Sequence, residues 1–346
     1  MTNTSRVTTA TLSVESPVRA PLTGRVRWTR FSNRAVPYLY ISPFFIVFAA
    51  VGLFPLLFTL FISMFDWKLT TTSVSGATFV GLENYVWELT KDPYFWPSLL
   101  NTFSIFIIST VPQLTLATFI AVLLDRHLRA KVFWRMGVLL PYIVAPVAIA
   151  LIFGAVFRDP VQGGLANSLL EMVGLDPVSW RSNRWLSHTA IATMVNFRWT
   201  GYNALILLAA MQAVPRDQYE AAAIDGAGAW RRFWSVTLPS IRGTMIFVVL
   251  TATMAGLRIF DEPRMFDTVP GSVGGPGGVF RTVALQLWAI GFSAQGQLGR
   301  ASAIAWLLFL IIMMVTGLNW WLSNRISDDE VAAPRSRRTR RKAVSR

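Results

Sequence analysis

Long apolar runs alternate with short polar connections along most of this chain. Six runs are almost free of charge over roughly 20 residues or more, the length that a helix needs to cross a bilayer. They cover residues 35–65, 93–124, 136–157, 185–215, 243–260 and 301–324. Arg198 lies inside the fourth run, Arg258 lies near the end of the fifth, and Pro141 and Pro146 interrupt the third. The pattern predicts an all-α membrane protein with six transmembrane helices.

A seventh segment, residues 282–299, is uncharged but less apolar than the six runs. Its sequence TVALQLWAIGFSAQGQLG contains three Gln and three Gly. If it crossed the membrane, the basic C-terminal tail would lie outside the cell, against the distribution of charge described next. We therefore expect a re-entrant or interfacial segment on the outer side.

Charge patterning sets the expected orientation. The chain is 53% hydrophobic and only 14% charged, whereas a soluble domain carries about 25% charged residues. Its net charge of +14 comes from basic residues at the termini and in alternate connections, which favours orientation in a membrane over nucleic-acid binding. This bias predicts a disordered basic cytoplasmic leader (1–34), a membrane domain (35–324), and a basic cytoplasmic tail (325–346). It also places the connection at 216–242 in the cytoplasm.

That connection holds a segment too polar to cross a membrane, YEAAAIDGAGAWRRFWSVTLPS at residues 219–240. We expect a helix–turn–helix in which three consecutive alanines (221–223) allow close approach by another surface and Gly226 permits a sharp turn. Pro239 is suited to begin the next span. Aromatic and basic side chains of the returning part would lie at the lipid headgroups: Trp230, Arg231, Arg232, Phe233 and Trp234. An ordinary amphipathic interfacial helix is the alternative.

The spacing of this segment resembles the signature of permease subunits of binding-protein-dependent ABC importers: E-A-A, three residues, G, nine residues, I, one residue, L-P. Here it reads Glu220-Ala221-Ala222, Gly226, Val236 in place of Ile, and Leu238-Pro239. Further stretches are similar to the maltose- and glycerol-phosphate-type, carbohydrate-uptake branch. They are FVGLENY (79–85), LLPYIVAP (139–146), RIFDEP (258–263) and GGPGG (274–278).

The resemblance implies a type I ABC importer permease fold in the inner (plasma) membrane of a bacterial-type cell. It implies that a coupling helix at about 216–239 seats in an ATPase and transmits closure of the ATPase dimer to the membrane helices, which alternate between outward and inward access. The residues assigned to ATPase coupling are Glu220, Ala221, Ala222, Asp225, Gly226, Leu238 and Pro239. The implied partners are a homologous second permease, an ATP-binding cassette ATPase dimer and an extracytoplasmic sugar-binding protein.

Polar residues inside the spans are candidates for the substrate site. The fourth span concentrates hydrogen-bonding groups and aromatic rings, the mixture that sugars require. The candidates are Asn196, Trp199, Thr200, Tyr202, Asn203, Arg258 and Asp261. Arg258 and Asp261 could equally form an ion pair at the outer interface. Weaker candidates, equally suited to joining helices, are Asn101, Gln113 and Tyr142.

The chain carries no signal for catalysis. It lacks a Gly-x-x-x-x-Gly-Lys phosphate loop, so ATP and Mg²⁺ are expected to be used by the partner ATPase, with no cofactor in this chain. Only His127 and His188 are present, with no Cys, so a metal site is not expected. An ion-coupled secondary transporter, the main alternative, usually shows inverted repeats and buried mid-span acids. A lipid-modifying enzyme would need clustered catalytic groups. The sequence does not indicate whether the substrate is a disaccharide, an oligosaccharide or a glycerol-phosphate-like compound.

Overall fold

The computed structural model describes residues 24–70, 76–126, 128–268, 271–292 and 296–331. The chain divides into two units, residues 1–58 and 59–346, and each is described here by itself. Helices dominate both units, as the apolar runs predict.

The first unit is a helical stretch. It contains α1 (Gly24–Val47), a π-helical segment (Phe48–Leu53) and the beginning of α2 (Phe54–Ile62). Helix α1 continues without a break across the boundary predicted between residues 34 and 35, so the predicted leader is not wholly disordered. Residues 1–23, the remainder of that leader, lie outside the described residues. Large apolar side chains of this stretch, such as Tyr40 and Phe44, are exposed on the isolated chain, as suits a helix that faces lipid or a partner.

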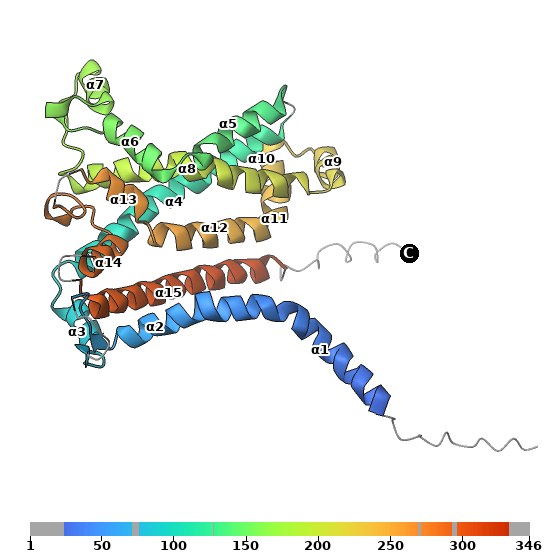
Figure 1. The fold of residues 1–346 in the computed structure, drawn as a ribbon. Helices are drawn as coiled ribbons and strands as arrows, with labels where there is room; N and C mark the ends of the chain where they lie inside the picture. Colours follow the sequence, from blue (N-terminus) through green and yellow to red (C-terminus); the bar gives the residue numbers. More distant parts are fainter. Residues whose placement is uncertain (1–23, 71–75, 127, 269–270, 293–295, 332–346) are drawn as a thin grey trace, which may run out of the picture. The chain divides into compact units, whose positions relative to one another are not determined.

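The second unit contains one two-stranded antiparallel pair and a bundle of helices (Figure 1). The strands are β1 (Phe65–Asp66) and β2 (Thr78–Phe79). The helices of three or more turns are α4 (Phe95–Asp125), α5 (Lys131–Ile143), α6 (Pro146–Val156), α8 (Arg184–Gln212), α12 (Arg242–Leu257) and α15 (Leu298–Val331). Shorter helices connect them: α3 (Glu83–Thr90), α7 (Leu165–Met172), α9 (Arg216–Ile224), α10 (Ala229–Arg232), α11 (Leu238–Ser240), α13 (Asp261–Phe266) and α14 (Val283–Gly291). Single turns of 3-10 helix lie at Pro160–Gln162 and Pro276–Gly278.

Among the described residues, three helical stretches are long and apolar enough to cross a membrane: Val36–Ile62, Phe95–Asp125 and Leu298–Ser323. Two bent pairs of helices raise this number to five if each pair counts as one span: Lys131–Ile143 with Pro146–Val156, and Ala229–Ser240 with Arg242–Leu257. The expected number of six crossings therefore stays a prediction.

The third apolar run, which two prolines interrupt, is not a straight helix. Helices α5 and α6 meet at an angle of 90°. Val144 and Ala145, at the break, have extended backbones, with ψ of 135° and 140°. A residue before proline is disfavoured in the helical conformation, which explains the break before Pro146. The sequence indicates the prolines but not the size of the bend.

The fourth run forms α8, which lies at the centre of the unit between α4, α5 and α12. Small residues permit this close packing: Ala117, Ala121 and Ala204 are fully buried at the interface between α4 and α8. A Cβ at Gly201 would lie 1.8 Å from the carbonyl oxygen of Val138 on α5. Because neighbouring helices cover α8, its polar side chains can lie away from lipid.

Helix α14 forms the middle of the seventh segment. It has nine residues, about 14 Å at 1.5 Å per residue, which is too short to cross a bilayer. It packs against α4 and α15. Its length is consistent with a re-entrant or interfacial segment.

Candidate functional site

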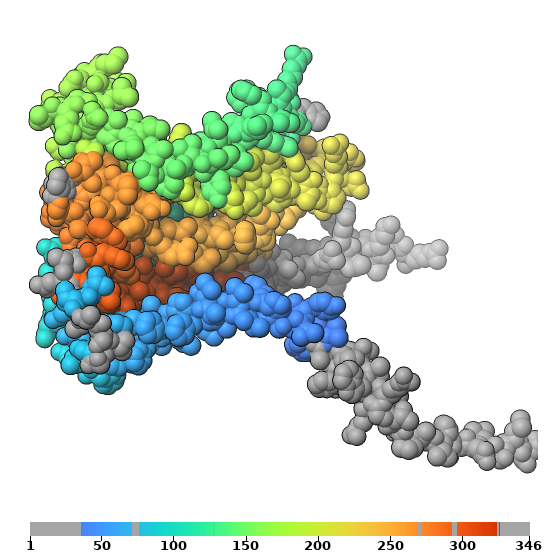
Figure 2. Space-filling model, in the orientation of Figure 1, coloured from blue at the N-terminus to red at the C-terminus, as the bar shows by residue number. Residues whose placement is uncertain are grey.

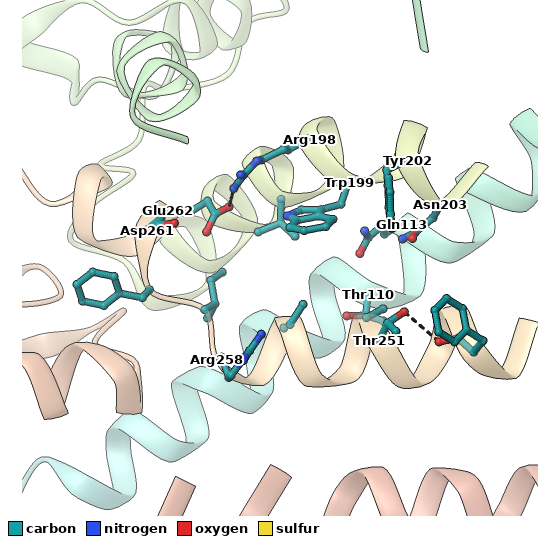
Figure 3. A pocket seen from close by; sticks show the side chains of 17 residues that line it. Thr110, Gln113, Arg198, Trp199, Tyr202, Asn203, Thr251, Arg258, Asp261 and Glu262 are labelled. Carbon is teal, nitrogen blue, oxygen red and sulfur yellow. Dashed lines mark hydrogen bonds and ion pairs between the residues drawn. The ribbon is translucent and has the colours of Figure 1, made fainter. Parts of the chain in front are cut away.

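A cavity of about 510 Å³ lies between α4, α8, α12 and α13 (Figure 3). The polar and aromatic residues on its wall come from all four helices and from the turn that joins α12 to α13. They are Thr110, Gln113, Arg198, Trp199, Tyr202, Asn203, Phe247, Thr251, Arg258, Phe260, Asp261 and Glu262. The volume falls within the range of about 300–1,000 Å³ typical of small-molecule sites.

Two aromatic side chains on the cavity wall, Trp199 and Tyr202, pack against each other and against Tyr142, which does not line the cavity. The rings of Tyr142 and Tyr202 stack with centroids 4.6 Å apart and planes inclined by 21°. Trp199 meets both rings edge to face, at 5.3 Å from Tyr142 and 6.0 Å from Tyr202. The stack restrains the orientation of Tyr202 on the cavity wall, where a flat ring can cover the C–H face of a sugar.

Charged groups gather at the α13 end of the cavity. Arg198 lies 3.4 Å from a carboxylate oxygen of Glu262, and its guanidinium carbon lies 5.3 Å from the centroid of the Trp199 ring. Glu262 is 6% exposed, so this ion pair is largely shielded from water. Asp261 and Arg258 also line the cavity, but they do not form an ion pair within 4 Å. The interfacial ion pair considered from the sequence is therefore absent between these two side chains.

Five of the seven substrate candidates line the cavity: Trp199, Tyr202, Asn203, Arg258 and Asp261. Asn196 and Thr200 do not line it, so their part in substrate binding stays a prediction. Val195, Trp199 and Tyr202, spaced by four and then three residues, share the face of α8 that meets the cavity. The sequence showed a polar segment but did not resolve which face of it lines the cavity.

Other residues of the wall were missed or underrated. Glu262 was not considered, although it follows Asp261 directly in the sequence. Gln113, a weaker candidate from the sequence, lines the cavity, and so does Thr110 on the same helix, which the sequence did not single out. Asn101 does join segments, because its amide donates to the carbonyl oxygens of Gly278 and Arg281. Threonine and glutamine in a span carry little signal in one sequence, because such residues commonly satisfy helix backbones.

The predicted helix–turn–helix is present between α8 and α12. Helix α9 (Arg216–Ile224) ends at a turn in which the amide of Gly226 donates to Ala223 and the amide of Ala227 donates to Ala222. This pair of bonds forms a Schellman motif, in which the residue after the C-cap has a left-handed backbone. Gly226 fills that role with φ of 78°. The turn is thus fixed by backbone hydrogen bonds.

Most residues assigned to coupling are exposed. Glu220, Ala221, Asp225, Gly226 and Pro239 are exposed, whereas Ala222 and Leu238 are half-buried. The segment lies at the opposite end of its unit from α13, at the surface of the molecule, where it is yellow in Figures 1 and 2. A hydrogen bond of 3.1 Å between the hydroxyls of Tyr219 and Thr237 ties α9 to the returning part.

The returning part differs from the expectation at its end. It consists of α10, a π-helical segment (Phe233–Thr237) and α11, followed by a bend of 73° before α12. We predicted that Pro239 begins the next span. It lies instead in the first turn of α11, before the bend. Trp230 and Trp234 are exposed, as a headgroup anchor would require.

No group of three or more His, Cys, Asp or Glu side chains that could hold a metal ion occurs in the described part of the chain. The ring nitrogens of His188 lie 2.9 Å from the Ser104 hydroxyl and 3.0 Å from the Val279 carbonyl. His188 thus joins three segments of the bundle. His127 lies outside the described residues.

Comparison with known proteins identifies the family of this chain. Residues 92–328 match the family described as the binding-protein-dependent transport system inner membrane component. An arabinooligosaccharides transport system permease protein, AraP, of Halalkalibacterium halodurans is 32% identical over 82% of this chain and 86% of its own length. A trehalose/maltose transport system permease protein, MalF, of Thermococcus litoralis is 31% identical over 83% of this chain and 93% of its own length.

A solved structure shares the fold. It is a bacterial alginate ABC transporter in complex with an alginate pentasaccharide-bound periplasmic protein. The likeness has a TM-score of 0.71 at 17% sequence identity and covers 86% of this chain and 97% of that chain. At this identity the likeness concerns the fold alone.

Proposed function

The chain belongs to the family of inner membrane components of binding-protein-dependent transport systems, and from this premise we propose that it translocates a sugar as one permease of an ATP-driven importer. The observation that carries the proposal is the exposed turn of α9, with Gly226 at φ of 78°. It offers a rigid projection to a partner. A separate ATPase dimer, a second permease and an extracytoplasmic receptor complete the proposed assembly.

The cavity supports a sugar as the substrate. Relatives at 28% to 32% identity carry names that refer to arabinooligosaccharides, lactose and trehalose/maltose. The stacked Tyr202 offers an aromatic face, and the Asn203 and Gln113 amides offer donors and acceptors for hydroxyl groups. We infer that a saccharide binds in the cavity between α4, α8 and α12 during the transport cycle.

The arrangement of helices supports mechanical coupling. Helix α9 follows α8 after a break of only three residues, and α8 carries Trp199, Tyr202 and Asn203. A displacement of α9 by a closing ATPase would therefore be transmitted along α8 to the cavity wall. Alternating access then requires that α8 and its neighbours have two packed arrangements, which ATP binding and hydrolysis in the partner exchange. This chain would perform no bond chemistry.

The test is ATP-dependent sugar uptake into vesicles that contain the assembled importer. Glu220→Ala should lower both uptake and co-purification of the ATPase, because it removes an exposed charge from the proposed contact. Glu171→Ala on α7 is the matched control, because Glu171 is also an exposed helical carboxylate but lies far from α9. Uptake driven by a proton gradient without ATP, or equal ATPase attachment in both variants, would contradict the proposal.

A further inference from the structure

A second cavity, of about 290 Å³, lies at the end of the helical bundle that bears α3 and α14, opposite α9 (Figure 1). Its wall combines two guanidinium groups, a carboxylate, amides and two aromatic rings: Arg281, Arg300, Asp92, Gln286, Trp87 and Tyr94. None of these residues lines the central cavity. In the proposed orientation this end faces the outside of the cell.

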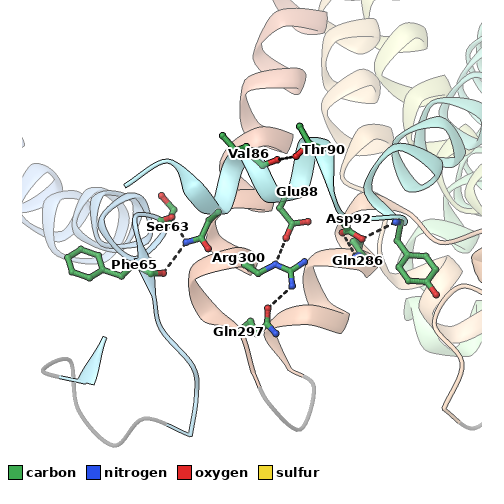
Figure 4. A network of polar contacts seen from close by, with 11 residues as sticks. Ser63, Phe65, Val86, Glu88, Thr90, Asp92, Gln286, Gln297 and Arg300 are labelled. Carbon is green, nitrogen blue, oxygen red and sulfur yellow. Dashed lines mark hydrogen bonds and ion pairs between the residues drawn. The ribbon is translucent and has the colours of Figure 1, made fainter. Parts of the chain in front are cut away.

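Arg300 is held by three neighbours, and Figure 4 shows its hydrogen bonds to two of them, Glu88 and Gln297. Its Nε donates to Glu88 at 2.6 Å and its Nη1 donates to the side-chain oxygen of Gln297 at 2.7 Å. Its guanidinium carbon also lies 3.4 Å from the centroid of the Trp87 ring. These contacts fix the plane of the guanidinium on the cavity wall.

Arg281 is held in the same manner by different partners. Its Nε donates to the Val273 carbonyl at 2.8 Å, and its Nη1 donates to the side-chain oxygen of Gln286 at 3.0 Å. Its guanidinium carbon lies 4.1 Å from the centroid of the Tyr94 ring. Among the described residues, neither Arg281 nor Arg300 has a hydrogen bond from Nη2. Two oriented donors thus remain on one small cavity.

The side-chain oxygens of Asp92, Gln286 and Gln297 on this wall each already accept one hydrogen bond. One oxygen of Asp92 accepts the Gln286 amide at 2.7 Å, and the other accepts the Tyr94 backbone amide at 2.9 Å. The side-chain oxygens of Gln286 and Gln297 accept from the two guanidiniums. A neutral sugar hydroxyl needs acceptors as well as donors, whereas a carboxylate only accepts. The two Nη2 groups without a hydrogen bond among the described residues are therefore suited to a carboxylate.

The electrostatics of the cavity also favour an anion. Asp92 is the carboxylate on the wall, facing two guanidiniums. Glu88 lies behind Arg300 with 0% exposure, and burial raises its pKa to about 8 even though Arg300 opposes the shift. Burial also lowers the pKa of Arg281, which means that its cation lacks solvation. A bound carboxylate would compensate for this lost solvation.

We propose that this cavity is an outer subsite for a sugar that carries a carboxylate, such as a uronate. The planar guanidiniums suit bidentate recognition of a carboxylate. The volume is just below the range of about 300–1,000 Å³ typical of drug-sized ligands, which suits a single sugar ring. The inference rests on the proposed function for the side of the membrane and for the carbohydrate class of the ligand.

The test is calorimetric titration of the purified importer with D-glucuronate and with D-glucose. A Tyr202→Ala background weakens binding at the central cavity, so the remaining signal reports the outer one. D-glucuronate should bind and D-glucose should bind at least about tenfold more weakly, since a hydrogen bond to a charged group is worth about 1.5–3 kcal/mol. Equal binding of both sugars, or no binding of D-glucuronate, would overturn the proposal.

Arg281→Gln removes the charge but keeps an amide that can reach the Val273 carbonyl, and it should weaken D-glucuronate binding at least about tenfold. Arg264→Gln is the matched control, because Arg264 also stacks on a ring, 4.3 Å from the Trp288 centroid, yet does not line this cavity. If Arg281→Gln does not fold, Ala289→Phe fills the cavity without removing any of the hydrogen bonds described. Unchanged affinity in these variants would overturn the inference.

Two further outcomes separate this inference from the proposed function. If Arg281→Gln weakens attachment of the extracytoplasmic receptor while D-glucuronate fails to bind, the cavity receives a protein carboxylate and the sugar subsite is wrong. If D-glucuronate binds as expected but uptake does not depend on ATP, the subsite stands and the proposed importer function fails.

Discussion

Gly201 allows α5 and α8 to approach each other, and its replacement by alanine gives the sharpest test of this packing. A Cβ at this position would lie 1.8 Å from the carbonyl oxygen of Val138 and 2.7 Å from its carbonyl carbon. Contacts shorter than 3.0 Å are essentially never seen for a real Cβ. Because the obstacle is backbone, no side-chain rotation relieves it, and α5 must move away from α8.

The size of the effect follows from two opposing contributions. Overpacking a well-packed site costs about 1–3 kcal/mol, and a rigid backbone obstacle places Gly201→Ala at the upper part of that range. Replacing a helical glycine by alanine returns about 0.5–1 kcal/mol through lower chain entropy. We expect a net loss of about 1–2 kcal/mol in the free energy of unfolding.

Gly137→Ala is the matched control. Gly137 lies inside α5 itself, and a Cβ there would meet nothing within 4 Å. Only the gain from replacing a helical glycine by alanine remains, so the free energy of unfolding of this variant should rise by about 0.5–1 kcal/mol. The two single-methyl changes are thus expected to have opposite signs.

The assay is unfolding of the purified chain in mixed micelles of detergent and SDS, followed by Trp fluorescence. A second readout is sugar affinity, because displacement of α5 would separate Tyr142 from Tyr202, whose ring centroids are now 4.6 Å apart. Gly201→Ala should weaken sugar binding and Gly137→Ala should not. If Gly201→Ala were as stable as Gly137→Ala, the tight contact between α5 and α8 would be refuted.

Three other predictions concern the turn, the cavity and the buried acid. Gly226→Ala, at φ of 78°, should cost about 1–2 kcal/mol locally and reduce ATP-dependent uptake, whereas Gly228→Ala, at φ of −65°, should leave uptake unchanged. Tyr202→Ala should weaken sugar binding at least about tenfold, because loss of a buried aromatic anchor costs about 2 kcal/mol or more. The control is Phe197→Ala, at an exposed position outside the cavity wall. Equal effects of the two variants on sugar affinity would count against the site. The pKa of Glu88 is about 8 in the folded chain and 4.5 when unfolded. Its contribution to stability therefore falls as pH rises between these values. Glu88→Gln should reduce the dependence of the melting temperature on pH over this range, and an unchanged dependence would refute the assignment.

The sequence was sufficient for the features that depend on local composition and spacing. Long apolar runs specify membrane helices because lipid does not satisfy an exposed backbone, and a helix satisfies its own. The turn at Gly226 was predictable because a left-handed residue after α9 favours glycine. The resemblance at residues 220–239 likewise indicated the family, which residues 92–328 match.

Tertiary structure decided which polar residues meet. Trp199, Tyr202 and Asn203 of α8 line the cavity, while Asn196 and Thr200 do not, and only the packing of the neighbouring helices around α8 decides this. The pairing of Arg198 with Glu262, 64 residues later, was equally invisible, as was that of Glu88 with Arg300. Side chains far apart in sequence are brought together by helix packing, and one sequence without its fold carries no distance between them.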